Sequence, residues 1–257
     1  MKFFRKLRRN EEGATAIEYG LIAALIAVAG LICVTLILFG ARLGLWEPII
    51  GFGLYRSYFN AIGVGIFSAG LIALATHLGR GEKGWAAVGG VVTLLGLGIL
   101  FPLISNTVNP QPRSAPIHDI TTDTTNPPAF EVLDDTRAGA NNTLEYGGAE
   151  VADQQVTAYP DIAPLETGLS TDAAFERALE VAGEMGWEIV ATDPTRHRFE
   201  ATARTSVFYF VDDIVVAVTP AENGSRVDMR GVSRVGRSDQ GVNAARIRTF
   251  QQQFHKE

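Results

Sequence analysis

The sequence predicts a membrane α-helical region of three transmembrane helices followed by an α+β domain, whose antiparallel four-stranded sheet and two helices follow the order α-β-β-β-β-α. Three observations support this fold class. Three long apolar runs fill residues 1–104, a Pro-rich polar stretch occupies residues 105–170, and helix-like and strand-like periodicities resume at residue 171. We therefore expect a membrane region over 1–104, an extended linker partly docked on the domain over 105–170, and the α+β domain over 171–257.

The membrane spans are expected at about residues 16–39, 60–78 and 85–104. Nineteen residues without a charge, 21–39, form the core of the first run, close to the roughly 20 that a helix needs to cross the hydrocarbon layer. Small residues in the second and third runs predict faces where helices pack closely. They are Gly65, Ala69 and Ala73, and Gly89, Gly90, Gly96 and Gly98. The spans offer no ionisable group at mid-membrane depth, which argues against a channel or carrier.

Charge predicts which side of the membrane each part occupies. The five basic residues before the first span outnumber the two in the next loop, Arg42 and Arg56. By the positive-inside rule the N-terminus is cytoplasmic and the C-terminal domain lies outside. Residues 105–257 carry 13 Lys and Arg against 23 Asp and Glu, and such an acidic domain repels phosphate backbones, so no nucleic-acid partner is expected. The single cysteine, Cys33, lies in the first span and excludes an intramolecular disulfide.

The elements of the C-terminal domain follow from periodicity and turn residues. A helix is expected to begin at Thr171 or Asp172, and strands at 187–192, 197–204, 207–219 and 225–235, with Asn223-Gly224 supplying a tight turn. Ser238 or Asp239 caps the last helix. In the linker, residues 117–130 and 158–165 look docked on the domain, whereas 134–155 is polar and Gly-rich and is expected to be a mobile loop.

The candidate site is a group of acidic residues and arginines in the domain. Asp212 and Asp213 are adjacent in an apolar strand, so they must point to opposite faces of the sheet and cannot form a carboxylate dyad. An inward carboxylate needs a cation, and the following strand places alternate arginines on one face. Two interpretations stay open, structural ion pairing or a pocket for a small anionic ligand. The candidate ligand-binding residues are His118, Asp119, Asp123, Asp212, Asp213, Arg230, Arg234, Arg237, Asp239, Asn243 and Arg246.

The same residues give little support to catalysis. His118, Asp119 and Asp123 could begin a metal site, but their spacing matches no known motif, so no metal is predicted. The stretch 236–241 has the wrong spacing for a nucleophile elbow. No phosphate loop or dinucleotide fingerprint occurs. We therefore expect no cofactor and assign no catalytic residue, and the chain is more an interaction or binding protein than an enzyme.

The N-terminus resembles that of Flp-type (type IVb) prepilins. The basic leader ends at Gly13, and cleavage would fall between Gly13 and Ala14, which places the family's Glu-Tyr pair at Glu18 and Tyr19. The resemblance implies processing by a prepilin peptidase and a Glu18 carboxylate that neutralises the terminal ammonium of a neighbouring subunit. It covers about 30 residues, whereas the chain continues for more than 200 residues beyond them.

A second resemblance covers most of the chain, about residues 41–254. The sequence is similar to the bacterial domain-of-unknown-function 1499 family, which implies an envelope membrane protein with a small α+β domain and no established activity. The stretches that carry it are Arg42-Leu-Gly-Leu-Trp46, residues 116–123, Asn126-Pro-Pro-Ala-Phe130, Tyr159-Pro-Asp-Ile-Ala-Pro164, Gly186-Trp-Glu-Ile-Val190, Asp212-Asp213, and residues 233–239 with Asn243 and Arg246.

Three functional hypotheses follow. The leading one is a bacterial inner-membrane, multi-pass envelope protein that presents a periplasmic interaction or small-ligand-binding domain. Its partners would be the lipid bilayer and another envelope protein or a small anionic ligand. One alternative is a pilin-like subunit processed by prepilin peptidase at Gly13/Ala14. The other is an envelope enzyme that uses the acidic and arginine cluster.

Overall fold

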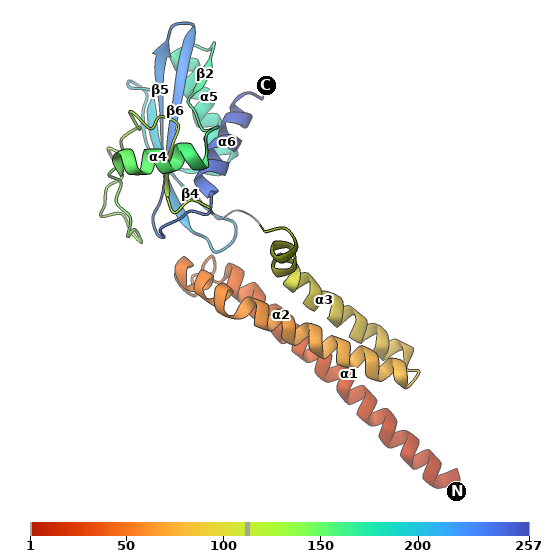
Figure 1. The fold of residues 1–257 in the computed structure, drawn as a ribbon. Helices are drawn as coiled ribbons and strands as arrows, with labels where there is room; N and C mark the ends of the chain where they lie inside the picture. The colour runs from red at the N-terminus through yellow and green to blue at the C-terminus, as the bar shows by residue number, and fades with distance from the viewer. Residues whose placement is uncertain (1, 111–113, 257) are drawn as a thin grey trace. The chain divides into compact units, whose positions relative to one another are not determined.

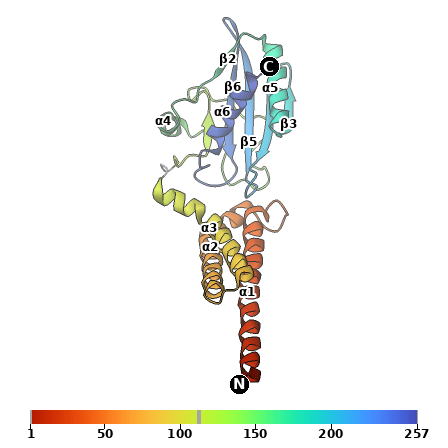
Figure 2. The same ribbon diagram turned by 90° about the vertical axis from the view of Figure 1, so that its right-hand side faces the viewer.

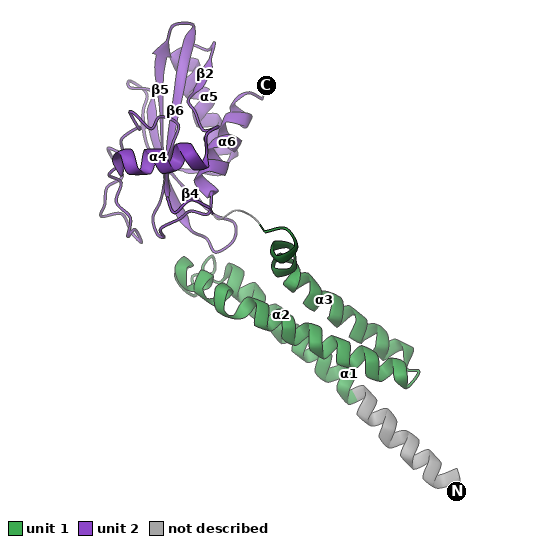
Figure 3. Ribbon diagram, in the orientation of Figure 1, with its two compact units in different colours: residues 1–111 green, residues 112–257 purple. Residues whose placement is uncertain are grey.

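The computed structural model describes residues 2–110 and 114–256, with side chains described from residue 18 onward. Gly13 and Ala14, the predicted processing residues, therefore lie outside the residues whose side chains are described. The chain divides into two compact units, residues 1–111 and 112–257, coloured separately in Figure 3.

Unit 1 consists of three long helices, α1 (Lys2–Phe39), α2 (Pro48–Gly79) and α3 (Lys83–Val108). Each contains an apolar stretch long enough to cross a membrane, at 18–39, 48–79 and 83–108. Most large apolar side chains of these stretches are exposed on the outside of the bundle, as expected for helices surrounded by lipid. Helix α2 begins at Pro48, well before the apolar run at residue 60, because Pro suits the first turn of a helix and residues 49–59 contain nothing that interrupts one.

The helices of unit 1 approach one another at glycines. A methyl group added at Gly70 would lie 2.4 Å from the backbone of Thr93, and one at Gly96 would lie 2.3 Å from the backbone of Phe67. Gly89 packs in the same way on Leu74. The predicted packing role of Gly89 and Gly96 is thus confirmed, whereas that of Gly65 and Gly98 is wrong, since both face open space. The buried face of α2 contains the predicted Ala73, together with Gly63, Ile66 and Gly70, which were not predicted.

The described residues of unit 2 form an antiparallel sheet and three helices. Its elements are β1 (Asp119–Thr121), α4 (Gly148–Ala158), β2 (Leu165–Thr167), α5 (Thr171–Glu184), β3 (Glu188–Asp193), β4 (Arg198–Arg204), β5 (Val211–Ala221), β6 (Gly224–Ser233) and α6 (Val242–Phe254). The sheet order is β1-β6-β5-β4-β3, and β2 also pairs with β6. The predicted order α-β-β-β-β-α is present from α5 to α6.

The described part of unit 2 has six strands, so the prediction of a four-stranded sheet is wrong in this detail. The two additional strands, β1 and β2, come from the Pro-rich stretch and pair with different halves of β6, Thr121 with Arg230 and Leu165 with Val227. Each has only three residues, too few to show a periodicity. They are strands because their main chains form hydrogen bonds with β6, and β6 is distant from both of them in the sequence.

Two other local predictions are corrected. Residues 134–155, expected to form a mobile loop, contain the first eight residues of α4, and Gln155 of this helix is 1 % exposed. Gln155 exchanges two hydrogen bonds with the backbone of Thr121, which fixes the helix beside β1. The strand expected from Val207 begins instead at Val211, because residues 207–210 form the loop between β4 and β5.

One face of the sheet is apolar. Helices α5 and α6 cover it (Figure 2), and their Phe175, Val181, Ile247 and Phe250 pack on Phe199, Ala201, Ile214, Val216 and Met229 of the strands. Ser170 begins α5, since its side-chain oxygen accepts a hydrogen bond from the Ala173 amide. Because side chains alternate along a strand, the residues between these point away from the two helices. That other face positions the candidate site.

Candidate functional site

The charged sheet face is the side of β4, β5 and β6 that points away from α5 and α6. Residues 122–146 cover it, so most of its polar side chains are buried or half-buried. Its charged members are Arg198, Glu200, Arg204, Asp213, Arg226, Asp228 and Arg230, with Arg234 directly after β6. Burial of charges requires partners, and the structure supplies a partner for each of these residues.

Arg230 and Asp119 form a deeply buried ion pair, with 2 % and 4 % of their surface exposed. The guanidinium donates two hydrogen bonds to the carboxylate, at 2.9 and 2.7 Å, and another to the Leu144 carbonyl at 2.8 Å. Its carbon lies 5.4 Å from the centre of the Phe130 ring and 5.3 Å from that of Tyr146, where the ring electrons attract the cation. Strand β6, strand β1 and the covering loops therefore meet at Arg230.

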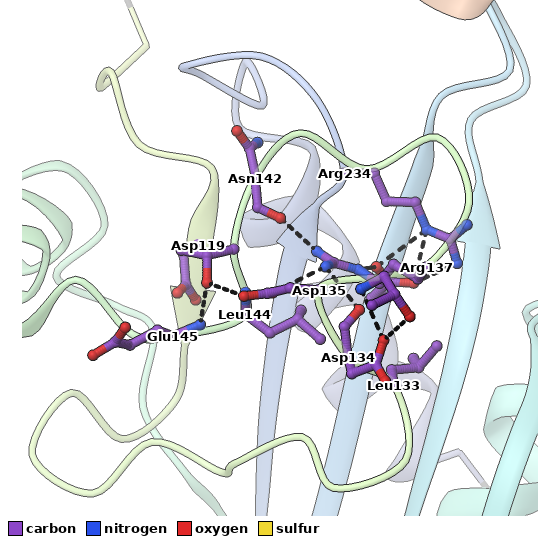
Figure 4. A network of polar contacts seen from close by, with 12 residues as sticks. Asp119, Leu133, Asp134, Asp135, Arg137, Asn142, Leu144, Glu145 and Arg234 are labelled. Atoms are coloured by element: carbon purple, nitrogen blue, oxygen red, sulfur yellow. Dashed lines mark hydrogen bonds and ion pairs between the residues drawn. The ribbon is translucent and has the colours of Figure 1, made fainter.

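Asp213 is fully buried and binds two arginines, Arg137 and Arg234. Figure 4 labels both arginines. Arg234, the residue directly after β6, reaches it at 2.8 and 3.0 Å, and Arg137, within residues 122–146, reaches it at 2.5 Å. Arg137 also donates to the Asn142 carbonyl at 3.0 Å, and Arg234 to the Ala138 carbonyl at 2.8 Å. The two guanidinium groups thereby tie the loop around residues 134–142 to the sheet.

Arg226, near the start of β6, forms ion pairs on the same face. It donates to Asp123 at 2.5 Å and to Asp228 at 2.7 Å. Burial of Asp123 opposes ionisation, but hydrogen bonds from the Asn126 and Thr125 amides and the Arg226 charge outweigh it and lower the pKa of that carboxyl group. The residues 123–126 therefore form an ordered turn closed by an ionised carboxylate.

Glu200 is a buried residue of this face that the sequence analysis did not single out. Its carboxylate is 2 % exposed and accepts hydrogen bonds from the backbone amides of Glu131, Val132 and Leu133, at 2.6 to 3.2 Å. The only sequence signal is an acidic residue in the alternating strand 198–204. The alternation of the strand predicts which face of the sheet Glu200 occupies, but it does not predict which loop covers that face.

Asp212 lies on the opposite, helix-covered face, as predicted from alternation. Arg246 of α6 donates to it at 2.6 Å and also binds the Asn243 side chain. Asn243 further contacts the Ser233 hydroxyl at 3.1 Å. Asp239 accepts hydrogen bonds from the Gly241 and Asn243 amides, and so closes the first turn of α6. Burial raises the pKa of Asp239, despite these two hydrogen bonds.

The predicted site residues thus fall into separate groups. Asp119 and Arg230, Asp213 and Arg234, and Asp123 with Arg226 lie along the charged sheet face, whereas Asp212, Asp239, Asn243 and Arg246 meet at the start of α6. His118 takes part through its backbone carbonyl, which accepts from the Ser233 amide. Arg237 is exposed in the loop after β6. In the described part of the chain, no three His, Cys, Asp or Glu side chains converge as metal ligands.

An open pocket of about 440 Å³ lies beside the Arg230 pair. Apolar and aromatic side chains form part of its lining, and charged side chains form the rest. The first are Pro127, Ala129, Phe130, Leu133, Leu144 and Tyr146, and the second are Asp134, Asp135, Glu145 and Arg230. The Tyr146 hydroxyl is buried and makes no hydrogen bond within the described residues. Burial raises the pKa of Tyr146, and the nearby Asp119 charge raises it further.

The three apolar helices indicate a membrane-associated protein. They are joined to an α+β unit whose sheet has one charged face covered by loops. Residues 119–254, more than half of the chain, match the family described as "Protein of unknown function (DUF1499)", and the chain belongs to this family. Residues 7–44 match the Flp/Fap pilin component. Both resemblances inferred from the sequence are thereby confirmed. No curated protein matches the sequence.

Proposed function

We propose that this protein is a three-span inner-membrane protein of the bacterial envelope, which presents unit 2 in the periplasm as a binding module for a small ligand or another envelope protein. The observation that carries the binding role is the pocket beside Arg230. Its walls combine aromatic and apolar side chains with carboxylates, and one lining residue, Tyr146, has a buried hydroxyl with no partner among the described residues. Concave apolar surfaces with a few polar groups are typical of small-molecule sites.

The electrostatics of the pocket favour a neutral or cationic ligand. Arg230 is already bound by Asp119, whereas Asp134, Asp135 and Glu145 surround the opening. A small anionic ligand, the initial expectation, would have to compete with carboxylates of the chain for Arg226, Arg230, Arg234 and Arg246. Displacing a buried carboxylate from its arginine is costly. We therefore assign the ion pairs a structural role and the aromatic pocket the binding role.

The ligand proposal is tested by what copurifies with the full chain. The protein and its Tyr146→Phe variant are extracted from membranes in mild detergent, and the bound small molecules are identified by mass spectrometry. A compound should accompany the unaltered chain and decrease with Tyr146→Phe. Tyr159→Phe is the matched control, since the Tyr159 hydroxyl is also buried without a described partner but lies outside this pocket. Equal copurification with all three proteins would contradict the proposal.

The periplasmic location rests on the five basic residues before the first span. A periplasm-dependent phosphatase fused after Glu257 should be active, and a cytoplasm-dependent fluorescent protein at the same position should be dark. The opposite pair of results would reject the orientation and the localisation together, while leaving the pocket itself to the copurification experiment.

The match of residues 7–44 to the pilin component supports a second candidate, processing by prepilin peptidase. Glu18, the family's acidic position, is exposed on α1 and available to a neighbouring subunit. Peptide sequencing of the mature N-terminus should begin at Ala14 and change in Gly13→Ala. A start at Met1 in cells with active peptidase would remove this candidate. The enzyme alternative gains no support, because Asp212 and Asp213 lie on opposite faces and each is bound by arginine.

A further inference from the structure

The pocket beside Arg230 has more negative than positive charge around it. Four charged side chains line it, namely Asp134, Asp135, Glu145 and Arg230. The described ion-pair partners of these residues are Asp119, which binds Arg230, and Arg137, which binds Asp135. The lining and these partners therefore carry four carboxylates against two guanidinium groups. Such an excess of negative charge attracts cations and repels anions.

The guanidinium of Arg230 is not available to an anionic ligand, because each of its three nitrogens already donates a hydrogen bond to the chain. Two of them bind the Asp119 carboxylate, and one of these two also binds the Leu144 carbonyl. The third donates to the Pro128 carbonyl at 3.3 Å. The carboxylates are therefore the charged groups of the lining that a ligand can use.

Asp134 and Asp135 are held in the ionised form by hydrogen bonds from their own loop. The hydroxyl and the amide of Thr136 donate to Asp134 and lower the pKa of that carboxyl group. The Leu144 amide and the Thr143 hydroxyl donate to Asp135 and lower its pKa in the same way. Both carboxylates are therefore charged at neutral pH, and both are already bound by the chain.

Glu145 differs from these two carboxylates. Its side chain is exposed, and its carboxylate forms no ion pair or hydrogen bond with a described residue. Phe130 and Leu133, which line the same pocket, are half-buried and leave apolar surface accessible. The Phe130 ring lies on Arg230 and the Leu133 amide is bound to Glu200, so this lining is ordered without a ligand. An ordered site loses less entropy when a ligand binds.

We propose that the pocket binds a small amphipathic amine, whose ammonium group pairs with Glu145 and whose apolar part lies against Phe130 and Leu133. The inference rests on the binding function proposed above and names the class of ligand. An ammonium group donates charge-assisted hydrogen bonds to a carboxylate, and the charges of Asp134 and Asp135 add to the attraction. A neutral ligand of the same shape lacks both contributions. The volume of about 440 Å³ suits a small molecule.

The experiment compares three probes that share a benzene ring and differ in the charge of the end group. They are phenethylamine, phenethyl alcohol and hydrocinnamate. The full chain is held in phosphatidylcholine nanodiscs, and empty nanodiscs are used to subtract the partition of each probe into lipid. Dissociation constants come from ligand-detected NMR titrations at neutral pH. We expect phenethylamine to bind several-fold more tightly than phenethyl alcohol, and hydrocinnamate to bind most weakly.

A substitution at Glu145 tests the position of the ammonium group. Glu145→Gln keeps the size of the side chain and removes its charge, so it should weaken phenethylamine binding several-fold and leave phenethyl alcohol binding unchanged. Glu222→Gln is the matched control, since Glu222 is exposed in the turn between β5 and β6 and lies outside the pocket. Neither variant should change the unfolding temperature, because both side chains are exposed. Added salt should weaken phenethylamine binding less in Glu145→Gln than in the unaltered protein.

Three results would overturn the amine assignment. They are equal affinities for phenethylamine and phenethyl alcohol, an undiminished phenethylamine affinity in Glu145→Gln, and no binding of any probe. Tighter binding of N-acetyl-lysine methylamide than of phenethylamine would also overturn it, by showing that the pocket takes a protein side chain. The proposed binding function is decided separately by copurification. A compound that depends on Tyr146 but contains no amine would reject the amine and leave the binding function standing.

Discussion

The sheet of unit 2 has one face covered by helices α5 and α6 and another covered by residues 122–146. The first cover consists of regular elements whose apolar side chains interlock with Phe199, Ile214 and Val216. The second is formed by loops in the described residues and is held by hydrogen bonds to the side chains of Arg230, Asp213 and Glu200. Apolar contacts need only complementary volume, whereas charges need specific partners. The loops over the charged sheet face are therefore fixed residue by residue.

The largest expected effect is the loss of Arg230 from the charged sheet face. Arg230→Ala leaves the Asp119 carboxylate buried without its bidentate partner, and we expect about 3–5 kcal/mol of destabilisation. The free energy of unfolding can be measured in the full chain through Trp187, which is buried in unit 2, after Trp46 and Trp85 are replaced by Phe.

A double variant tests whether the loss comes from the stranded charge. Arg230→Met with Asp119→Asn removes both charges and should recover a large part of the stability, because no ionised group is then left buried alone. If the double variant were as unstable as Arg230→Ala, the stability would come mainly from the packing of Arg230 against Phe130 and Tyr146 instead.

A smaller effect is expected at Asp213, because it has two arginines. Arg234→Ala removes one of them, but Arg137 remains at 2.5 Å. We expect about 1.5–3 kcal/mol, the range for hydrogen bonds to a charged group. Protease digestion should also show faster cleavage near residue 138, whose carbonyl Arg234 binds. A loss as large as that for Arg230→Ala would show that the second arginine gives no protection.

The helix-covered face provides the contrasting substitution. Ile247→Val removes one methylene from a fully buried residue of α6 and should cost about 0.5–1.5 kcal/mol. No charge is left without a partner, so the loss should be the same at low and high salt. A strong dependence on salt would show that the two faces are energetically coupled.

Elements with their own periodicity could be predicted from the sequence, and those defined by distant partners could not. The three spans, α5, α6 and strands β3 to β6 carry local patterns of 3.6 or 2 residues. Alternation also placed Asp212 and Asp213 on opposite faces. Strands β1 and β2 have three residues each, and nothing within three residues distinguishes a strand from the Pro-rich coil around it.

The candidate site was predicted in composition but not in arrangement. The acidic residues and arginines were identified, yet their pairing depends on which loop covers the sheet. Arg137 lies in a stretch whose polar, Gly-rich composition indicates mobility, and only its contact with Asp213 shows that it is fixed. The partners of Glu200 and Tyr146 are also distant in sequence. Glu200 binds backbone amides about 70 positions away, and Tyr146 contacts Arg230, about 85 positions away.

The smallest effect should appear only as a dependence on pH, at the start of α6. Burial raises the pKa of Asp239 above its ordinary value of 3.8. The folded protein therefore binds this proton more readily than the unfolded chain. The contribution to stability is fully present below pH 3.8 and is lost as the pH rises through the raised pKa of the folded state.

Asp239→Asn cannot titrate, and its amide oxygen can still accept a hydrogen bond from Gly241 or Asn243. The difference in unfolding free energy between the two proteins, measured from acid to neutral pH, should therefore shift in favour of the variant as the pH rises. Asp161→Asn is the control, because its exposed carboxyl group is bound by Arg248 and has a lowered pKa, which makes its pH dependence opposite in sign. A difference for Asp239→Asn that does not change with pH would show that the two amide hydrogen bonds fully offset the burial of this carboxylate.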